Sequence, residues 1–368
     1  MKPLPEAIVQ TLADPLRSAR VLAESGKPIV GFVGSDAPFE LALAAGAIPV
    51  ALPSFAHRPT PRADEVLEPR FTPAARSIVD QWLAGELDFL QSVVFSRGDD
   101  STQRSYYYLC ELQRTASTRG PRPLLFDIAK IPRASSIAHT QHAMCRLASE
   151  LGSDLSRLPS AIETRNARRT LLAQLISQRA GDRPPLGSLC EQLLRAADVM
   201  PAAHGDDALR EFLARASVDA GAAGAPRLLL AGTVPPDARL HEAVEHGGGC
   251  VVAECDEHPG AGLGTPIALG RPALESLALH YQALPRGPRS FGDFSEAVQR
   301  AAEASRADAV IFWLIEEDEA LAWHLPALSA ALAHAETPLL ALTRRRWDTH
   351  DGALEEITRF TRSLRSRT

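Results

Sequence analysis

Short apolar runs alternate along most of the chain with segments whose apolar residues recur every three to four positions. The runs suit buried strands, and the periodic segments are typical of amphipathic helices. Strands are predicted at residues 28–34, 48–52, 89–95, 124–128, 227–232, 250–253, 309–314 and 339–342. Helices are predicted at residues 7–24 with an interruption at Pro15, and at 39–45, 103–112, 240–246, 294–304, 321–335 and 354–364.

A long helical stretch separates two groups of predicted strands. From residue 135 to about residue 204 no strand-like run interrupts the helical spacing, and four predicted strands lie on each side. Apolar strands that alternate with amphipathic helices form parallel sheets covered on both faces. We therefore predict an α/β fold of two similar doubly wound parallel-sheet domains joined by a helical segment. The expected bounds are 1–26 for an N-terminal helical segment, 27–134 for the first α/β domain, 135–205 for the helical connecting segment and 206–368 for the second α/β domain.

Composition and charge narrow the class of protein further. The 368 residues include 39 Lys and Arg against 45 Asp and Glu, a formal net charge of −6, so no basic surface argues for nucleic acid. No apolar run reaches the roughly 18–20 residues of a membrane span. The first residues lack the charged start and apolar stretch of a signal peptide, so we expect a cytoplasmic protein. The five cysteines are irregularly spaced without a CxxC pair, which excludes a disulfide framework and any thiolate site recognisable by spacing.

The residues that directly follow the predicted strands are the first place to look for chemistry, because open parallel sheets bind ligands at the carboxyl ends of their strands. These positions are acidic and rich in oxygen donors, although solvated loops and helix N-termini favour the same residue types. They are residues 35–36, 96–101, 233–235, 254–258 and 316–319. The chain has no GxGxxG after its first strand, no phosphate-binding GxxxxGK[ST] and no GxSxG nucleophile elbow.

Three other sequence features are explained largely by local structure rather than by a functional site. His139 and His142 lie three residues apart, a spacing that suits a metal, but without a carboxylate at matching spacing a solvated helix face is favoured. The glycines at 247–249 follow a helix and enter a strand, so they predict a helix stop. Consecutive tyrosines at 106–108 point in different directions on a helix, so one or two face a site while another packs.

Several segments together resemble the motifs of one known family. Residues 35–41, Ser-Asp-Ala-Pro-Phe-Glu-Leu, with the following 44–50, are similar to its Cys-x-x-Pro-x-Glu-Leu motif and Ala-Ala-Gly-x-x-Pro stretch. Residues 99–104 with the tyrosines after them resemble its Cys-Asp-Ser-x-x-Arg motif and aromatic helix. Residues 318–326 resemble its third motif, Cys-Asp/Glu-Pro with an aromatic residue and a later proline. Supporting similarity lies at 161–169, 228–232 and 247–254, so the resemblance covers roughly residues 27–364. The family that these segments resemble is that of the 2-hydroxyacyl-CoA dehydratases and benzoyl-CoA reductases.

The resemblance implies a cofactor that this chain does not have the ligands for. Members of the family place three cysteines around an iron–sulfur cluster between the domains, and here those positions are Ser35, Asp99 and Asp318. Cys255 alone follows a strand on the predicted site side, and one thiolate does not hold a cluster. We therefore expect no cofactor in this chain alone, and an iron–sulfur cluster only in a partner chain.

The resemblance also suggests roles for particular residues. Ser35, Asp99 and Asp318 are expected to line the cavity of the former cluster, at the family's ligand positions. Arg104 and Tyr107 are candidates for substrate contact, whereas catalytic residues stay unassigned and Glu40 is expected to be structural.

Three hypotheses for function follow. The first is a cluster-free subunit that pairs with a cluster-bearing homologous subunit and shapes an acyl-CoA pocket, as part of an acyl-CoA dehydratase (lyase) or acyl-CoA reductase complex. The second is a different, non-redox enzyme on the same scaffold, in which the oxygen donors Ser35, Asp99 and Asp318 hold a hard divalent cation or supply a general acid and base. The third is a non-catalytic binding or scaffold protein with a disused pocket.

Overall fold

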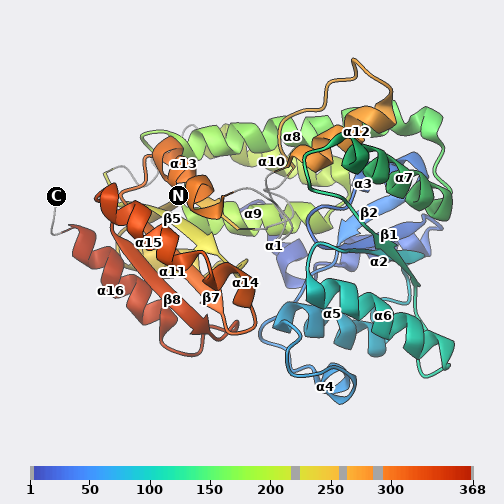
Figure 1. The fold of residues 1–368 in the computed structure, drawn as a ribbon, viewed down its shortest axis with the longest axis horizontal. Helices are drawn as coiled ribbons and strands as arrows, with labels where there is room; N and C mark the ends of the chain where they lie inside the picture. The colour runs from blue at the N-terminus through green and yellow to red at the C-terminus, as the bar shows by residue number, and fades with distance from the viewer. Residues whose placement is uncertain (1–3, 217–223, 257–262, 285–292, 366–368) are drawn as a thin grey trace.

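The computed structural model describes residues 4–216, 224–256, 263–284 and 293–365. Its strands form two four-stranded parallel sheets, which confirms the predicted α/β fold (Figure 1). The first sheet has the order β2-β1-β3-β4 and the second the order β6-β5-β7-β8. The strands are β1 (Ile29–Val33), β2 (Ile48–Ala51), β3 (Ser92–Ser96), β4 (Arg122–Phe126), β5 (Arg227–Gly232), β6 (Cys250–Cys255), β7 (Ala309–Ile315) and β8 (Leu339–Arg345).

Helices cover both faces of each sheet and form a separate layer between the two groups of strands (Figure 1). The helices before the second sheet are α1 (Glu6–Ala13), α2 (Arg17–Glu24), α3 (Phe39–Ala44), α4 (Pro61–Val66), α5 (Pro73–Leu83), α6 (Asp100–Arg114), α7 (Ala134–Leu151), α8 (Leu158–Ala180), α9 (Gly187–Val199) and α10 (Ala202–Ala216). A 3₁₀ turn at Leu155–Arg157 precedes α8. The later helices are α11 (Arg239–His246), α12 (Ala273–Ala283), α13 (Phe294–Ser305), α14 (Glu319–Ala322), α15 (Leu325–His334) and α16 (Ala353–Arg365). No described helix is both long enough and apolar enough to cross a bilayer.

The structure differs from the predicted elements in three ways: a strand start, a divided helix and unpredicted helices. The strand predicted at 89–95 begins at Ser92, because residues 87–90 form a turn in which the Leu90 amide bonds to the Leu87 carbonyl. The single helix predicted at 321–335 is two helices, α14 and α15, because Pro326 in the first turn of α15 has no amide hydrogen to continue a helix from before it. Helices α4, α5 and α12 were not predicted at all.

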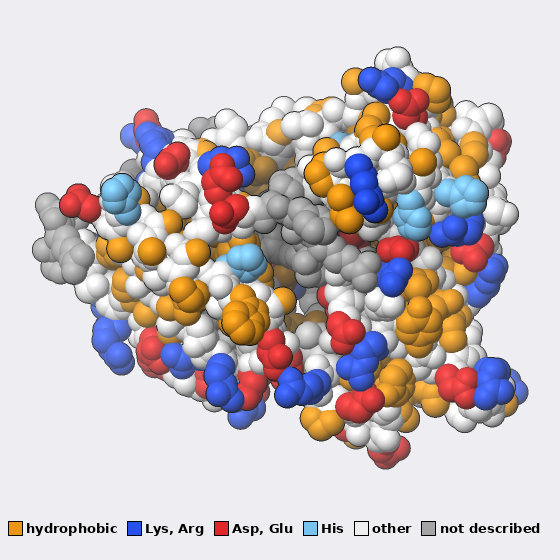
Figure 2. Space-filling view, in the orientation of Figure 1, with side chains coloured by type: hydrophobic (Ala, Val, Ile, Leu, Met, Phe, Trp, Pro, Cys, Tyr) orange, Lys and Arg blue, Asp and Glu red, His pale blue; other side chains and the backbone are white. Residues whose placement is uncertain are grey.

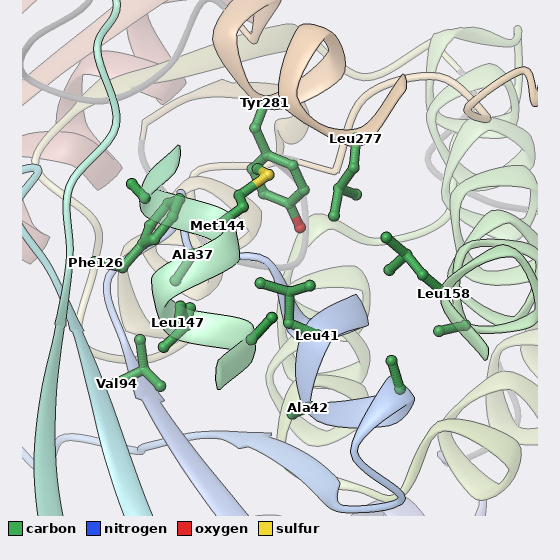
Figure 3. Close-up of a cluster of buried hydrophobic side chains, with 14 of the residues drawn as sticks. Ala37, Leu41, Ala42, Val94, Phe126, Met144, Leu147, Leu158, Leu277 and Tyr281 are labelled. Carbon is green, nitrogen blue, oxygen red and sulfur yellow. The ribbon is translucent and has the colours of Figure 1, made fainter. Parts of the chain in front are cut away.

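The core of the first sheet includes a helix from far along the chain. α12 follows β6 of the second sheet, yet its Leu277 and Tyr281 pack with Leu41 of α3 and Met144 of α7. Figure 3 shows these side chains pointing toward one another above the first sheet. The chain therefore returns from the second sheet to the first before it forms α13. The return of α12 to the first sheet connects the two sheets. The bounds of the four predicted segments stay a prediction.

A buried ion pair joins α8 to α3, and a hydrogen bond to the same carboxylate adds α12. The Arg169 guanidinium of α8 donates from Nη2 to Glu40 Oε1 of α3 at 2.5 Å, and neither side chain is exposed. The Tyr281 hydroxyl of α12 donates to Glu40 Oε2 at 2.9 Å. Burial acts to raise the pKa of Glu40, but the charges of Arg169 and Arg165 outweigh it and hold that pKa below its usual value. Glu40 is thus a structural residue, as expected.

A second buried network anchors α8 to the second sheet. Arg179 of α8 donates from both terminal nitrogens to the two carboxylate oxygens of Glu254 on β6, each at 2.5 Å. His241 Nε2 of α11 lies 3.0 Å from Glu254 Oε1. The same helix therefore carries one buried arginine toward each sheet, which fixes how the two halves are connected.

We predict that Glu40→Gln lowers the free energy of unfolding by about 3 kcal/mol, because it leaves the buried Arg169 charge without its counter-charge. Tyr281→Phe, which removes only a hydrogen bond to the carboxylate, is expected to cost about 2 kcal/mol. Urea unfolding of both variants checks the order of the two effects. A Glu40→Gln variant as stable as the wild type would contradict the anchoring role.

Candidate functional site

Each sheet has one point where the strand order reverses, and these two points carry the predicted site residues. In the order β2-β1-β3-β4 the reversal lies between β1 and β3, and in β6-β5-β7-β8 it lies between β5 and β7. Ligands of doubly wound sheets bind at the carboxyl ends of the strands at such a switch point. Ser35 follows β1 and Asp99 follows β3, whereas Asp318 follows β7. All three predicted cavity residues therefore lie at a switch point.

Each switch point contains a glycine at a position where a residue with a side chain would clash with the neighbouring strand. Gly34 after β1 has φ +97°, and a Cβ there would lie 2.6 Å from the Cβ of Ser96 at the end of β3. Gly232 at the end of β5 has φ +114°, and a Cβ there would lie 2.2 Å from the carbonyl oxygen of Trp313 on β7. In each sheet the absent side chain lets the two strand ends approach closely.

The first switch point is closed by hydrogen bonds around a buried aspartate. The hydroxyl of Ser96 donates to Asp36 Oδ1 and accepts a 2.9 Å bond from the Gly98 amide. Asp36 and Ser96 are both buried. Ser35 is half-buried beside them, and its hydroxyl bonds to no other described residue.

Asp99 caps the helix that leaves the first switch point. Its Oδ1 accepts a 2.8 Å hydrogen bond from the Thr102 amide at the start of α6. Burial raises the pKa of Asp99, and the negative charges of Asp36 and Asp100 raise it further, against the two hydrogen-bonding contributions of Thr102. The carboxyl group is thus held in place locally and favours its proton more than an exposed aspartate does.

The second switch point is closed in a similar way. The Thr233 hydroxyl after β5 donates to Asp318 Oδ2 at 2.8 Å and accepts from the Ile315 amide at 3.3 Å. Burial raises the pKa of Asp318. Among the described residues, no hydrogen bond or ion pair joins Asp318 to Ser35 or Asp99.

The acidic end of β7 faces the first half of the molecule. Glu319 forms an ion pair with Arg70, in the segment between α4 and α5. Burial and the neighbouring Glu316 raise the pKa of Glu317, while the charge of Arg76 on α5 acts to lower it. Figure 2 shows acidic and basic side chains intermixed where α14 approaches α5.

The two candidate substrate contacts lie on α6 in different surroundings. Arg104 is engaged by Glu68 Oε2 at 2.6 Å and Asp100 Oδ2 at 3.4 Å, and its guanidinium lies 4.4 Å from the centre of the Phe71 ring. Tyr107 is 53% exposed. Tyr108, which was not singled out, donates from its hydroxyl to Glu68 Oε1 at 2.5 Å. Arg104 therefore has protein partners, and Tyr107 is the residue of the pair that solvent reaches.

Cys190 lies on α9, and Cys250 and Cys255 lie at the two ends of β6. Cys190 and Cys250 are buried, and burial raises their pKa to about 12 and about 11, so both are neutral thiols at neutral pH. Cys255 ends β6, the edge strand of the second sheet, and Glu257 and His258 after it lie outside the described residues.

Histidines do not form a metal site in the part of the chain that the structure describes. His139 Nε2 lies 3.6 Å from Asp127 Oδ2, which also accepts a 2.7 Å bond from Arg97, whereas His142 is exposed. Throughout the described ranges, no group of three or more His, Cys, Asp or Glu side chains is arranged to hold a metal ion.

Sequence reasoning missed the residues of the first half that face β7. Arg70 and Arg76 lie in the stretch from 53 to 88, for which no element was predicted. Thr60-Pro61 and Thr72-Pro73 would have indicated two helix starts, since threonine favours the N-cap and proline the first helical position.

Two doubly wound domains with hydrogen-bonded acidic switch points define the class: a two-domain α/β protein of the kind that binds ligands at strand ends. The family model described as 2-hydroxyglutaryl-CoA dehydratase, D-component, matches residues 35–359. The chain belongs to this family, which confirms the resemblance carried by the three motifs. A comparison with curated proteins finds no significant match.

We predict that Asp99→Asn gains stability relative to the wild type as the pH rises. Asparagine keeps the cap on α6 without a charge. Because the pKa of Asp99 is raised on folding, the native state binds the proton more tightly than the unfolded state does, and stability falls as pH rises from about 3.9 through the folded value. Urea unfolding of both proteins between about pH 4 and about pH 7 measures the difference.

Asp99→Ala serves as the matched control, since it removes charge and cap together and is expected to cost about 1 kcal/mol. An asparagine variant that loses stability relative to the wild type with rising pH would show that the folded state favours the carboxylate.

Proposed function

We propose that this chain is a cluster-free subunit of a 2-hydroxyacyl-CoA dehydratase-like complex and works beside a homologous chain that holds the iron–sulfur cluster. The observation that carries the proposal is the state of the three ligand positions. Each has an oxygen side chain in place of a thiolate, and two of the three are already held by local hydrogen bonds.

Such side chains do not fit an iron–sulfur cluster. Clusters are held by cysteine thiolates. Asp99 accepts a hydrogen bond from the Thr102 amide, and Asp318 accepts one from the Thr233 hydroxyl. The pKa of each carboxyl group is raised, which favours the protonated acid. Ser35 supplies a neutral hydroxyl. The cluster chemistry of the family is therefore assigned to a partner chain.

The ligand proposed for this chain is an acyl-CoA thioester, the class of compound named in the family description. It would lie at the carboxyl ends of β1, β3, β5 and β7, where open parallel sheets bind ligands. Tyr107 is the exposed aromatic side chain of the second motif. The chain would shape one wall of the pocket, with Ser35, Asp99 and Asp318 lining it.

Anaerobic copurification tests the proposal. A tagged form of this chain is produced together with the cysteine-bearing homologue from the same genome, and is expected to retain it in a stable complex that absorbs as an iron–sulfur protein. The chain alone is expected to be colourless. As a control, a homologue with its cluster cysteines changed to serine should lose the colour. Failure of the two wild-type chains to copurify would overturn the proposal.

The second candidate function is a non-redox enzyme that uses acid–base catalysis. It is favoured by the carboxyl groups of Asp99 and Asp318, because their raised pKa suits proton donation. It predicts turnover of a 2-hydroxyacyl-CoA by this chain alone, without ATP or reductant. Asp318→Asn should then lower the rate by about 100-fold. The matched control is Glu319→Gln, a neighbouring exposed carboxylate paired with Arg70. No turnover by the chain alone would remove this candidate.

Calorimetry with acyl-CoA compounds distinguishes these two candidate functions from a scaffold protein whose pocket is no longer used. Micromolar binding to the isolated chain or to the complex would exclude a purely structural role. Absence of binding to either would favour the scaffold interpretation.

A further inference from the structure

Four arginines of α8 are buried, and three of them have a carboxylate partner. The pairs are Arg168 with Asp206, Arg169 with Glu40 and Arg179 with Glu254. Arg165 is also buried, at 7% exposure, yet its guanidinium forms no ion pair with a described residue and donates no hydrogen bond to one. Within the described ranges, α8 therefore carries one buried cation that has no anion of its own.

This guanidinium keeps its charge in the folded protein. Burial lowers the pKa of Arg165 and the charge of Glu40 acts to raise it, while the charges of Arg168 and Arg169 lower it further. A buried lysine can release its proton, but an arginine stays protonated in proteins. A buried charge is costly unless it is paired. Arg165 is therefore a position at which an anion would be favourable.

Glu40 is already engaged by other groups. Its Oε1 accepts from Arg169 Nη2 at 2.5 Å, and its Oε2 accepts from the Tyr281 hydroxyl at 2.9 Å. The same carboxylate is the negative charge that acts on Arg165, so it serves two buried guanidinium groups at once. Arg165, Arg169 and Glu40 together therefore keep one positive charge in excess.

Aromatic rings hold Arg165 in place instead of an acceptor. Its guanidinium carbon lies 4.8 Å from the centre of the Phe39 ring, and Phe39 stacks on Phe32 of β1 with ring centres 4.2 Å apart. A ring face attracts a cation, but it does not replace the oxygen acceptors that the N–H groups lack. The guanidinium is thus positioned before an anion binds, which lowers the cost of binding.

The position lies beside the segment that leaves the first switch point. Phe39 is the first residue of α3 and follows Ser35 by four positions. Phe39 is half-buried and Arg165 keeps part of its surface, whereas Arg169 is fully enclosed. The exposed side of Phe39 is therefore the side from which a ligand group would reach Arg165, and the Glu40 pair would stay intact.

We propose that Arg165 binds the carboxylate group of a small organic ligand, with Phe39 as one wall of the site. A carboxylate presents two oxygens in one plane, which matches the planar N–H fork of a guanidinium. Its single negative charge equals the local excess, whereas a phosphate monoester carries about −1.5 to −2 at neutral pH. The inference goes beyond the proposed function and does not depend on it, because Arg165 is none of the three ligand positions.

Thermal melting of the full chain tests the site with defined anions. Sodium acetate, succinate and phosphate are each compared with sodium chloride at equal ionic strength. Acetate and succinate are expected to raise the melting temperature in a saturable way, because they bind the native state. Arg165→Met, which keeps an unbranched side chain without the charge, should weaken the apparent affinity at least about tenfold. Arg210→Met, at an exposed arginine paired with Asp207, is the matched control and should bind as the wild type does.

The ligand-free variants distinguish an anion site from a structural arginine. Arg168→Met breaks a buried ion pair, so it is expected to lower the melting temperature more than Arg165→Met does. A loss in Arg165→Met as large as that in Arg168→Met would contradict the proposal. Arg165→Lys keeps the charge without the fork and is expected to retain part of the carboxylate binding. Circular dichroism shows whether each variant is folded.

Acetyl-CoA and succinyl-CoA identify the molecule that bears the carboxylate. Tighter binding of succinyl-CoA than of acetyl-CoA, with the preference lost in Arg165→Met, assigns the carboxylate to an acyl group. Succinate that binds as tightly as succinyl-CoA assigns it to a free acid.

Three results would overturn the proposal. They are a wild-type chain that no carboxylate compound stabilises, an Arg165→Met variant that binds carboxylates like the wild type, and phosphate as the anion whose binding depends on Arg165. Copurification with the cysteine-bearing homologue is measured separately, so the proposed function stands or falls by its own experiment.

Discussion

The buried ion pair between Glu40 and Arg169 is the interaction on which the arrangement of the site depends. Glu40 lies five residues after Ser35, on the helix that leaves the first switch point, and Arg169 lies on the long helix that reaches both sheets. Tyr281 adds the helix that returns from the second sheet. Together they fix the end of β1 relative to the helical layer. The segments 35–41 and 161–169, which resemble two conserved stretches of the family, thus meet in one buried ion pair.

The same helix connects this anchor to the second sheet through Arg179 and Glu254. The two switch points are then closed by the same devices in each half: a glycine with positive φ where two strand ends meet, and a carboxyl group hydrogen-bonded by a hydroxyl. Asp36 with Ser96 closes the first and Asp318 with Thr233 closes the second. Carboxyl groups held in this way are poor replacements for thiolates, which supports the proposal that a partner chain holds the cluster.

The sequence predicted the strands well because the central ones are buried on both faces and read as continuous apolar runs, as at 309–314. The short helices α4 and α5 carry weaker periodic signals, and α12 packs against residues far away in the chain, so local patterns did not reveal them. Ser35, Asp99 and Asp318 follow predicted strands and stand at the ligand positions of the resembled motifs, which is why the sequence could propose them as cavity residues. Their partners Thr102 and Thr233, and the facing Arg70, depend on strand order and on tertiary packing.

The most direct test of the central claim is to measure iron and acid-labile sulfide separately in each chain of the anaerobically purified complex after the chains are dissociated under conditions that preserve the cluster. A cluster-free subunit predicts that iron and sulfide remain with the cysteine-bearing homologue and that this chain has none. Stoichiometric iron and sulfide in this chain, alone or after separation, would contradict the claim.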